Sequence, residues 1–361
     1  MQAMSLGDKI KQLPAAPGVY LMKDGQGGVL YVGKSKNLKA RVQSYFQSSS
    51  NQSPKTKKLV RHLKDFDCIP TDTELEALLL ESKLIKKLKP LYNRMLKRHK
   101  AYTYILIKRE QGLRRIKTAS AADDDGHSLY FGPFFNKNRV EETLSGLKRF
   151  LRIDCNSLAE DAPCLNHSLG LCLGHCFQKE KRAEYERIID RIIRLLQKQD
   201  ETIFRDMEEE MKLASARLDF ERAAGLKKTL DSLHSLVKKE EVARFTRANH
   251  KIVLAEALGE GTVKFFFIHR NKIVLKKKIN VHQAAGEHSL EKLAALAADC
   301  YAQNIPAPPF VRKEEMDQSQ IIFNYLHHGT CSHAFIEDAW LAPENRKTLK
   351  KLLAVLLQKE K

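Results

Sequence analysis

Two short runs rich in β-forming residues, joined by a glycine-rich link, constrain the fold of this chain more than any other feature. The runs are Pro17–Met22 and Val29–Lys34, and the link between them is Asp24–Gly28. Two such runs on either side of a short glycine-rich connection predict a β-hairpin. The N-terminal part of the chain is therefore expected to contain a small antiparallel sheet.

Side chains alternate between the two faces along each predicted strand. This places Tyr20 opposite Val19, and it separates Tyr31 from Leu30 and Val32. We therefore expect the two tyrosines, which lie on adjacent strands, to present their hydroxyl groups together.

A helix is predicted to follow the hairpin, with Ser35 as its N-cap. Leu38, Arg41, Val42 and Tyr45 fall on one face of this helix. An arginine on the inner face of a helix is unusual, because a buried cation must be paired.

A second helix is predicted from Glu74 to Leu88, where Pro90 stops it. Its apolar stripe consists of Leu75, Leu78, Ile85 and Leu88. Glu81 lies in the same stripe. An inward-facing arginine, an inward-facing glutamate and two facing tyrosines in one small unit predict an active site.

These segments resemble a known nuclease family. Gly18-Val19-Tyr20 and Tyr31-Val32-Gly33 resemble the two triplets of the GIY-YIG nucleases, with Val in place of Ile in both. The segment Glu81–Asn93 resembles the end of this domain in the UvrC family of excinucleases. The resemblance implies hydrolysis of DNA phosphodiester bonds.

The resemblance also implies individual roles. Glu81 would hold a single Mg²⁺ or Mn²⁺ ion, and Arg41 would bind the scissile phosphate. Tyr31 or Tyr20 would take a proton from the attacking water. Since the pKa of a free phenol is about 10, we expect Lys34 and Arg41 to lower it.

Two further residues complete the implied site. Tyr45 would orient a phosphate or a water, and Asn93 would orient Glu81 or the backbone. The alternative for the three tyrosines is packing alone. The alternative for Glu81 is a structural ion pair with Arg41 that has no chemistry.

The chain is strongly basic. It has 361 residues, room for two or three domains, and a formal net charge of +19. Residues 1–110 hold 22 Lys and Arg against 9 Asp and Glu. Such a concentration favours a polyanion as partner, and the resemblance implies double-stranded damaged DNA. The alternative is a solubilising surface, and for the lysines from Lys55 to Lys64 it is a solvated helix face.

The sequence also bears on the compartment. No run of about 18 or more apolar residues occurs, so we expect no membrane span. Met1–Leu13 has neither the apolar core nor the cleavage pattern of a signal peptide. We therefore expect the cytoplasm.

Four of the seven cysteines lie in one short window: Cys155, Cys164, Cys172 and Cys176. Such a cluster in a cytoplasmic chain favours a metal over disulfides, and thiolates suit zinc or an iron–sulfur cluster. The absence of Cys-x-x-C pairs and the resemblance to the UvrC cysteine region favour iron–sulfur. His167 and His175 are possible substitute ligands, and four reduced structural cysteines are the alternative.

The predicted fold class is α/β (α+β). We expect, in order, a nuclease domain (1–95), a connector (96–150), the cysteine region (151–177), a helical region (178–240) and a C-terminal α/β unit (250–361). In the connector we predict a strand at Tyr102–Ile107, an aromatic turn at Tyr130–Phe134 and a helix at Arg139–Phe150.

The C-terminal unit resembles the region that precedes the second nuclease domain of UvrC proteins. Its predicted strands span 252–257, 263–269 and 273–281, and its predicted helices span 290–303, 318–327 and 343–358. We find in it no carboxylate constellation for a second nuclease and no helix-hairpin-helix pair. The resemblance is therefore to a shortened UvrC-like protein.

Two amphipathic helices are predicted to form a hairpin over residues 201–236. The segment Leu218–Ala224 at its turn resembles the UVR motif, which implies pairing with a UvrB-type helicase. A hairpin this small cannot bury both faces alone, so a partner surface is physically reasonable. The alternative is a coiled-coil arm that packs on its own chain.

Taken together, the resemblance predicts a Mg²⁺-dependent endonuclease of nucleotide excision repair that makes one incision, on the 3′ side of the lesion. Two alternatives stay open. One is a repair adaptor that binds DNA and partner but has lost catalysis. The other is a GIY-YIG nuclease of recombination or of a mobile element.

Overall fold

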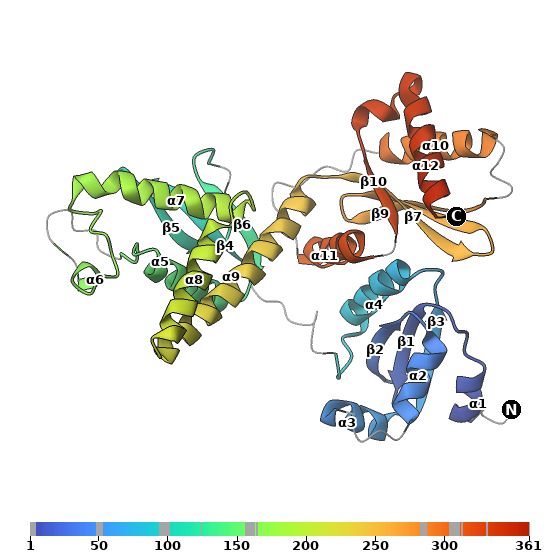
Figure 1. Cartoon of the computed structure of the whole chain (residues 1–361). Coiled ribbons are helices and arrows are strands. Elements are labelled where there is room, and N and C mark those ends of the chain that lie inside the picture. The colour runs from blue at the N-terminus through green and yellow to red at the C-terminus, as the bar shows by residue number, and fades with distance from the viewer. Residues whose placement is uncertain are drawn as a thin grey trace. The chain divides into compact units, whose positions relative to one another are not determined.

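The structure is a computed structural model of the whole chain, shown in Figure 1. It describes residues 5–47, 53–93, 102–123, 125–155, 163, 165–281, 287–302, 311, 313–329 and 331–360. The chain forms two compact units. Unit 1 contains Met1–His99, Ala248–Ala307 and Arg312–Lys361, and unit 2 contains Lys100–Arg247 and Pro308–Val311. Helices and strands occur in both units, so the predicted mixed fold class is confirmed.

The N-terminal part of unit 1 is built on a small antiparallel sheet with strand order β2-β1-β3. Its strands are β1 (Gly18–Lys23), β2 (Val29–Ser35) and β3 (Asp65–Pro70). Its helices are α1 (Leu6–Lys11), α2 (Leu38–Phe46), α3 (Pro54–His62) and α4 (Glu74–Leu88). The predicted hairpin and both predicted helices are therefore present.

The two faces of this sheet pack against different helices. Tyr20 and Met22 lie in one buried cluster with residues of α2 and α3. Val19 and Leu21 lie in another with Ala77 and Ile85 of α4. The period of two along β1 thus places α2 and α4 on opposite sides of the sheet.

Two details differ from the sequence-based expectation. The N-cap of α2 is Asn37 rather than Ser35, because the Asn37 side chain accepts a hydrogen bond from the N–H of Ala40. Leu30 shares the Tyr20 cluster instead of lying opposite Tyr31. A β-bulge causes this, since Met22 pairs with Tyr31 but the next residue pairs with Val29.

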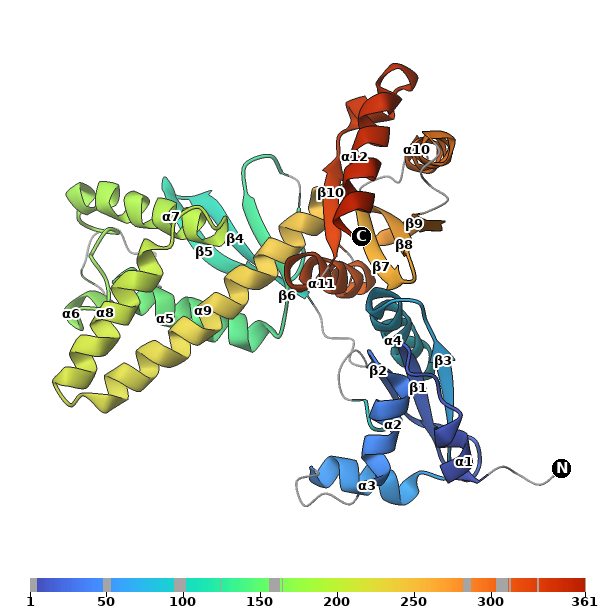
Figure 2. The same cartoon turned by 45° about the vertical axis from the view of Figure 1, so that its right-hand side comes forward.

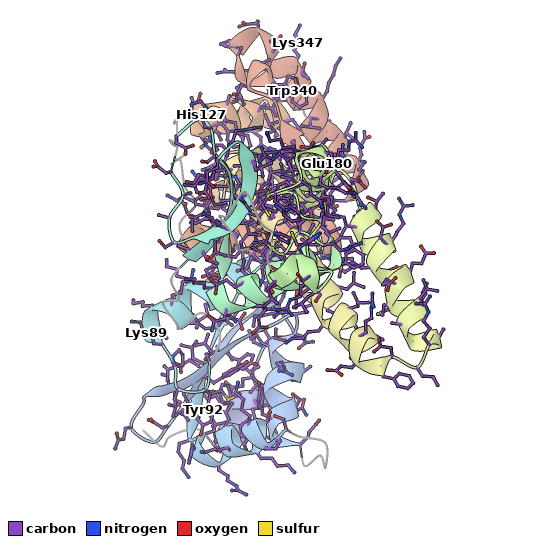
Figure 3. All side chains as sticks on the ribbon, turned by 90° about the vertical axis from the view of Figure 1, so that its left-hand side faces the viewer. Lys89, Tyr92, His127, Glu180, Trp340 and Lys347 are labelled. Carbon is purple, nitrogen blue, oxygen red and sulfur yellow. The ribbon has the colours of Figure 1, made fainter. Side chains whose placement is uncertain are left out.

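Helix α4 has a well-defined start and end. Thr73 caps its first turn by accepting a hydrogen bond from the N–H of Glu76. Lys89 ends it in a left-handed conformation with φ 47°, three residues before Tyr92 (Figure 3).

The C-terminal part of unit 1 contains a second antiparallel sheet, with strand order β10-β7-β8-β9. Its strands are β7 (Lys251–Gly259), β8 (Thr262–His269), β9 (Lys272–Asn280) and β10 (Ser332–Ile336). Its helices are α10 (Glu287–Ala302), α11 (Lys313–His328) and α12 (Arg346–Lys359). The first three strands and the helices match the prediction, whereas β10 was not predicted.

Alternation along β8 gives this sheet two different faces. Val263, Phe265 and Phe267 pack into a core with residues of α10 and α12. Lys264 and Phe266 point to the other face, where the Lys264 ammonium lies over the Phe266 ring. Lys264 is nevertheless buried.

Unit 2 contains a third antiparallel sheet, with strand order β5-β4-β6, and a set of helices. Its strands are β4 (Tyr102–Glu110), β5 (Leu113–Ala119) and β6 (Leu129–Phe135). Its helices are α5 (Lys137–Phe150), α6 (Leu165–Ser168), α7 (Arg182–Leu196), α8 (Thr202–Ala216) and α9 (Phe220–Arg247). The predicted aromatic turn at Tyr130–Phe134 is wrong, because these residues pair with β4 as part of β6.

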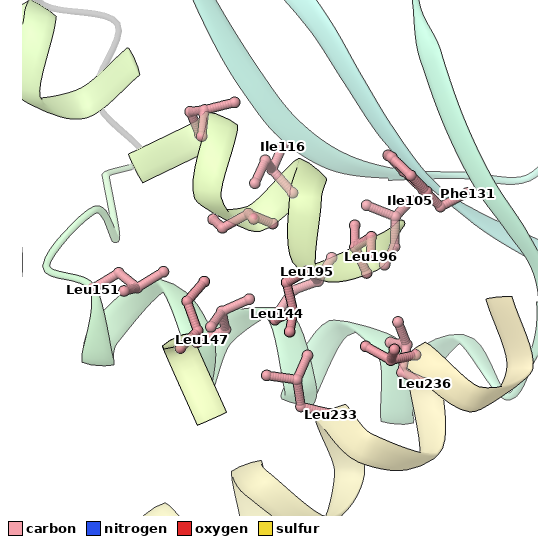
Figure 4. Packing of buried hydrophobic residues seen from close by; sticks show 14 of the residues in the cluster. Ile105, Ile116, Phe131, Leu144, Leu147, Leu151, Leu195, Leu196, Leu233 and Leu236 are labelled. Atoms are coloured by element: carbon pink, nitrogen blue, oxygen red, sulfur yellow. The ribbon is translucent and has the colours of Figure 1, made fainter. Parts of the chain in front are cut away.

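One continuous core joins the sheet to the helices of unit 2. Figure 4 shows Ile105 and Phe131 from the strands packed near Leu196 of α7, and Leu144 of α5 near Leu195. The segments that we predicted separately as connector and helical region therefore share one apolar cluster.

Helices α8 and α9 form the predicted hairpin and run side by side in Figures 1 and 2. Leu218 turns the chain between them in a left-handed conformation. The tip is apolar and exposed, with Leu213 44%, Leu218 73% and Phe220 63% accessible.

Candidate active site

Three tyrosines and an arginine converge beside β1 and β2. The hydroxyls of Tyr20 and Tyr45 lie 2.9 Å apart. The Arg41 guanidinium donates from Nε to the Tyr20 hydroxyl at 3.3 Å and from Nη2 to the Tyr45 hydroxyl at 3.4 Å. The rings of Tyr20 and Tyr31 are 6.1 Å apart. The predicted meeting of these side chains is therefore present, although Arg41 is solvent-exposed rather than inward-facing.

Glycine is required where the rings cross β2. A Cβ atom at Gly33 would lie 2.4 Å from the Tyr20 hydroxyl and 2.8 Å from the Tyr31 ring. A Cβ atom at Gly18 would lie 2.5 Å from the Ile69 carbonyl oxygen. The glycines of both triplets thus allow close packing of strand, ring and neighbouring backbone.

Glu81 lies on the other side of β2, on α4. Its Oε1 accepts a hydrogen bond from the backbone N–H of Lys34 at 3.0 Å. The carboxylate is thereby fixed against the strand that carries Tyr31. The side chain is only partly buried, which leaves room for ligands at the carboxylate.

Glu74 is a site residue that sequence reasoning missed. Its carboxylate receives the Lys34 ammonium at 2.5 Å and the Lys36 ammonium at 2.8 Å. Glu74 precedes Glu81 by seven residues, two helical turns, so both face the same side of α4. That spacing was the available signal in the sequence.

Asn93 is buried and holds the second strand. Its Nδ2 donates to the Val32 carbonyl at 2.8 Å, and its Oδ1 accepts from the Val32 N–H at 2.9 Å. This side chain therefore fixes the backbone between Tyr31 and Gly33, and among the described residues its hydrogen bonds go to Val32 rather than to Glu81.

The tyrosines are held in their neutral form. Burial, followed by the neighbouring Tyr45 and Tyr31, raises the pKa of Tyr20 far above its ordinary value. Burial, Tyr45 and Glu81 also raise the pKa of Tyr31, and the opposing effect of Arg41 is smaller. The expectation that nearby cations lower the phenol pKa is therefore wrong for the protein without a bound metal.

The pKa of the Glu81 carboxyl group is also shifted. Burial raises the pKa of Glu81, and the hydrogen bond from the Lys34 backbone opposes this only in part. In the described part of the chain no ion pair joins Glu81 to Arg41, so the structural pair that we considered is not formed.

The basic segment from Lys55 to Lys64 contributes one contact near the site. The Lys55 ammonium lies 6.0 Å from the centre of the Tyr31 ring. The other lysines of this segment are exposed to solvent. Lys57 and Lys58 lie on α3, and Lys64 follows its end.

The cysteine region brings two thiols together. Cys155 Sγ and Cys176 Sγ lie 3.9 Å apart, and Cys172 Sγ accepts from the Gly174 N–H at 3.4 Å. Cys164 lies outside the described residues. Within the described ranges no group of three or more His, Cys, Asp or Glu side chains is placed to hold a metal ion.

The two histidines of this region have contacts of their own. His175 is fully buried and stacks on Tyr185 with ring centres 3.8 Å apart. His167 Nδ1 lies 3.0 Å from the Cys172 carbonyl oxygen.

Comparison with known protein families matches three successive segments. Residues 16–94 match the UvrC-like GIY-YIG domain, residues 102–195 match the UvrC/Cho excinuclease middle domain, and residues 202–236 match the UvrB/uvrC motif. This chain is UvrC-like over all three segments. Its N-terminal domain is a GIY-YIG endonuclease domain of the UvrC type.

Curated UvrC relatives align with most of this chain. The UvrABC system protein C of Acetivibrio thermocellus is 33% identical over 327 residues, which cover 88% of this chain and 52% of that protein. The UvrABC system protein C of Moorella thermoacetica is 33% identical over 329 residues, which cover 90% of this chain and 53% of that protein. The chain thus spans about half the length of the curated relatives it matches.

A solved structure matches the nuclease domain alone. It is the N-terminal GIY-YIG endonuclease domain of UvrC from Thermotoga maritima, bound to its catalytic divalent cation, magnesium. The two sequences are 36% identical, and the match covers 25% of this chain and 99% of the chain in the solved structure, with a TM-score of 0.22. Across the described residues no helix is long and apolar enough to cross a membrane.

The close packing at Gly33 leads to a prediction. Gly33→Ala should lower the free energy of unfolding of the nuclease domain by about 1–3 kcal/mol, because the new methyl group overlaps the Tyr20 hydroxyl. Urea unfolding measures this. Gly25→Ala is the matched control, since its Cβ would come no closer than 3.6 Å to a neighbour. Equal stability of the two variants would contradict the packing argument.

Proposed function

We propose that this chain is a Mg²⁺-dependent DNA endonuclease of nucleotide excision repair that makes a single incision, on the 3′ side of the lesion. The observation that carries the proposal is the hydrogen bond between Glu81 and the Lys34 backbone. It fixes a carboxylate against the strand whose Tyr31 side chain faces the Tyr20–Tyr45–Arg41 cluster. The match to UvrC-type domains supports repair as the setting.

The residues at the site fit a single hard cation. Mg²⁺ takes oxygen ligands and is commonly held by one or two carboxylates, with waters and substrate phosphates around it. Glu81 supplies such a carboxylate, with one oxygen already oriented by a backbone N–H. When bound, the cation would polarise the phosphate and an attacking water.

Arg41 is suited to hold the scissile phosphate. Arg41 is an exposed residue, and the planar fork of its guanidinium matches phosphate oxygens. Hydrogen bonds to the Tyr20 and Tyr45 hydroxyls limit its rotamers before DNA arrives. Arg41 would therefore bind the phosphate with little loss of side-chain freedom.

The geometry favours Tyr31 over Tyr20 as the group that moves a proton. Tyr20 is 1% exposed and its hydroxyl is engaged by Tyr45 and Arg41, whereas Tyr31 is only partly buried. Because the pKa of Tyr31 is raised, its phenol is neutral when the water approaches. Tyr31 would therefore accept the proton of the attacking water while its own phenolic proton passes to the solvent that reaches this half-buried side chain, and Tyr20 and Tyr45 would orient the phosphate.

The test is nicking of an end-labelled duplex that carries one bulky lesion, with Mg²⁺ and a UvrB-type helicase. Glu81→Ala should reduce nicking by at least 10³-fold, on the order of 4 kcal/mol in the activation barrier, and leave DNA binding unchanged. Glu180→Ala, which removes an exposed carboxylate of unit 2, is the control.

Each other outcome has a defined meaning. Nicking that survives Glu81→Ala would contradict the assigned site. Binding of DNA and helicase without nicking by the wild type would identify a repair adaptor. Nicking that needs neither lesion nor helicase would identify a nuclease of recombination or of a mobile element.

We further propose that the α8–α9 hairpin recruits the UvrB-type helicase. The support is its apolar tip, where Leu218 and Phe220 are 73% and 63% exposed, and its match to the UvrB/uvrC motif. Apolar side chains this exposed at one point of a surface are typical of an interaction site.

The hairpin proposal predicts a loss of affinity. Phe220→Ser should weaken helicase binding by at least tenfold without lowering the melting temperature, because its ring is free of the core. Leu129→Ser, at a site 43% exposed on β6, is the control and should bind normally. Calorimetric titration with the helicase measures both. Unchanged affinity of Phe220→Ser would assign the hairpin to packing on its own chain.

The cysteine region remains a proposed iron–sulfur site, with zinc as the alternative. Two thiolates bound to one tetrahedral metal at about 2.3 Å lie about 3.8 Å from each other. The 3.9 Å separation of Cys155 and Cys176 fits this spacing. Cys172 and Cys164 would supply the remaining thiolates.

An absorbance spectrum of anaerobically purified protein tests this proposal. An iron–sulfur cluster gives a broad band near 400 nm, about where its sulfur-to-iron charge transfer lies, and Cys155→Ser should remove the band. Bound zinc without the band would establish the alternative. If the purified protein contains neither iron nor zinc, the four cysteines are structural.

A further inference from the structure

Within unit 1, the start of helix α4 carries more negative charge than its own domain neutralises. Asp72, Glu74 and Glu76 lie within five residues, just before the helical turn that leads to Glu81. Lys34 and Lys36 occupy the Glu74 carboxylate. The partners of Asp72 and Glu76 come from a distant part of the sequence.

Three lysines of the C-terminal sheet bind these two carboxylates. The Lys264 ammonium lies 2.5 Å from Asp72 Oδ2 and 2.8 Å from each Glu76 oxygen. Lys276 reaches Glu76 at 2.8 Å, and Lys278 reaches Asp72 at 2.5 Å. The result is one network that joins β8 and β9 to the first turn of α4. We call these five side chains the Lys264 cluster.

Lys264 differs from an ordinary surface lysine. Its side chain is 6% exposed and stands in a strand whose other central residues are apolar. A buried ammonium is tolerated only when it is paired, and loss of its partners is far more costly than loss of a surface pair. The two carboxylates are therefore what allows a lysine at this position.

Pairing with the lysines lowers the pKa of both carboxyl groups. Burial alone would raise the pKa of Asp72, but hydrogen bonds from Lys264 and Lys278 outweigh it and lower the pKa. The pKa of Glu76 is lowered in the same way, with burial opposed by Lys264 and Lys276. Both groups are thus ionised at neutral pH.

The anchored turn is continuous with the nuclease site. Glu74, between the two anchored residues, holds the Lys34 side chain, and Glu81, two turns later, holds the Lys34 backbone. A second ion pair, between Lys86 of α4 and Asp317 of α11 at 2.8 Å, anchors the far end of the helix. Because a helix moves as a rigid rod over this length, contacts at its ends fix the carboxylate between them.

We propose that the C-terminal α/β part positions the nuclease site, with the Lys264 cluster holding α4 so that Glu81 meets its metal at the correct place. The inference rests on the proposed function, because it concerns the same metal ligand. Lys264, Asp72 and Glu76 are positioning residues, since none of them contacts the tyrosine and arginine groups of the site.

The Lys264 cluster also changes the charge of the surface that DNA would approach. Without the three lysines, Asp72 and Glu76 would present negative charge close to a site that must bind phosphate, and like charges repel. With them, the surface at the start of α4 is net positive. The C-terminal part would therefore favour DNA binding as well as metal binding.

The experiment measures nicking by the full chain over a range of Mg²⁺ concentrations. Lys264→Met keeps the buried aliphatic stem and removes the charge, so it should raise the Mg²⁺ concentration for half-maximal nicking by about tenfold or more. The double variant Asp72→Asn, Glu76→Gln removes the same contacts from the other side and should act alike. Lys251→Met is the control, because its ion pair with Asp338 stays inside the C-terminal part.

A second readout does not depend on activity. Hydrogen exchange of the α4 amides should be faster in Lys264→Met and in the double variant than in wild type and Lys251→Met. If wild type fails to nick, the proposed function fails, and the exchange data still decide whether the cluster holds α4. An unchanged Mg²⁺ dependence and unchanged exchange in both the Lys264 and the double variant would overturn the inference.

Discussion

The hydrogen bond between the Lys34 N–H and the Glu81 carboxylate is the contact on which the site depends. It joins β2, which carries Tyr31 and Gly33, to α4, the only element on that side of the small sheet among the residues described. A carboxylate with one oriented oxygen is a good metal ligand, since the backbone holds it without consuming a second side chain. Apolar packing of Val32 of β2 with Ala77 and Ile85 of α4 holds the same two elements together.

The opposite side of the sheet carries the tyrosine–arginine cluster, which we propose binds the scissile phosphate. Two of the tyrosines, Tyr20 and Tyr31, pack against Gly33 so tightly that a single methyl group would displace them. Burial raises the pKa of Tyr20 and of Tyr31 and keeps both phenols protonated, and the hydroxyls of Tyr20 and Tyr45 orient Arg41 by accepting its hydrogen bonds. Glu81, the proposed metal ligand, and the tyrosine cluster that orients Arg41, the proposed phosphate ligand, therefore both contact β2.

Local chemistry allowed much of this to be predicted from the sequence. The span of α4 follows from its apolar period and the proline after it, and the prediction of Glu74–Leu88 is confirmed. The displaced Leu30 could not be predicted, because a bulge shifts the alternation without changing composition. The contacts of Lys264 could not be predicted either, since they join residues 188 or more apart. The direction of the tyrosine pKa shifts depended on burial, which periodicity does not measure.

We propose that Glu81 holds a divalent cation beside the tyrosine–arginine cluster. The most direct test is to measure Mn²⁺ binding by electron paramagnetic resonance. Mn²⁺ replaces Mg²⁺ at oxygen sites and gives a signal that falls when the ion is bound. We expect one Mg²⁺-displaceable Mn²⁺ ion per chain in the wild type and its loss in Glu81→Gln, with the fold retained. Equal Mn²⁺ binding by the two proteins would contradict it.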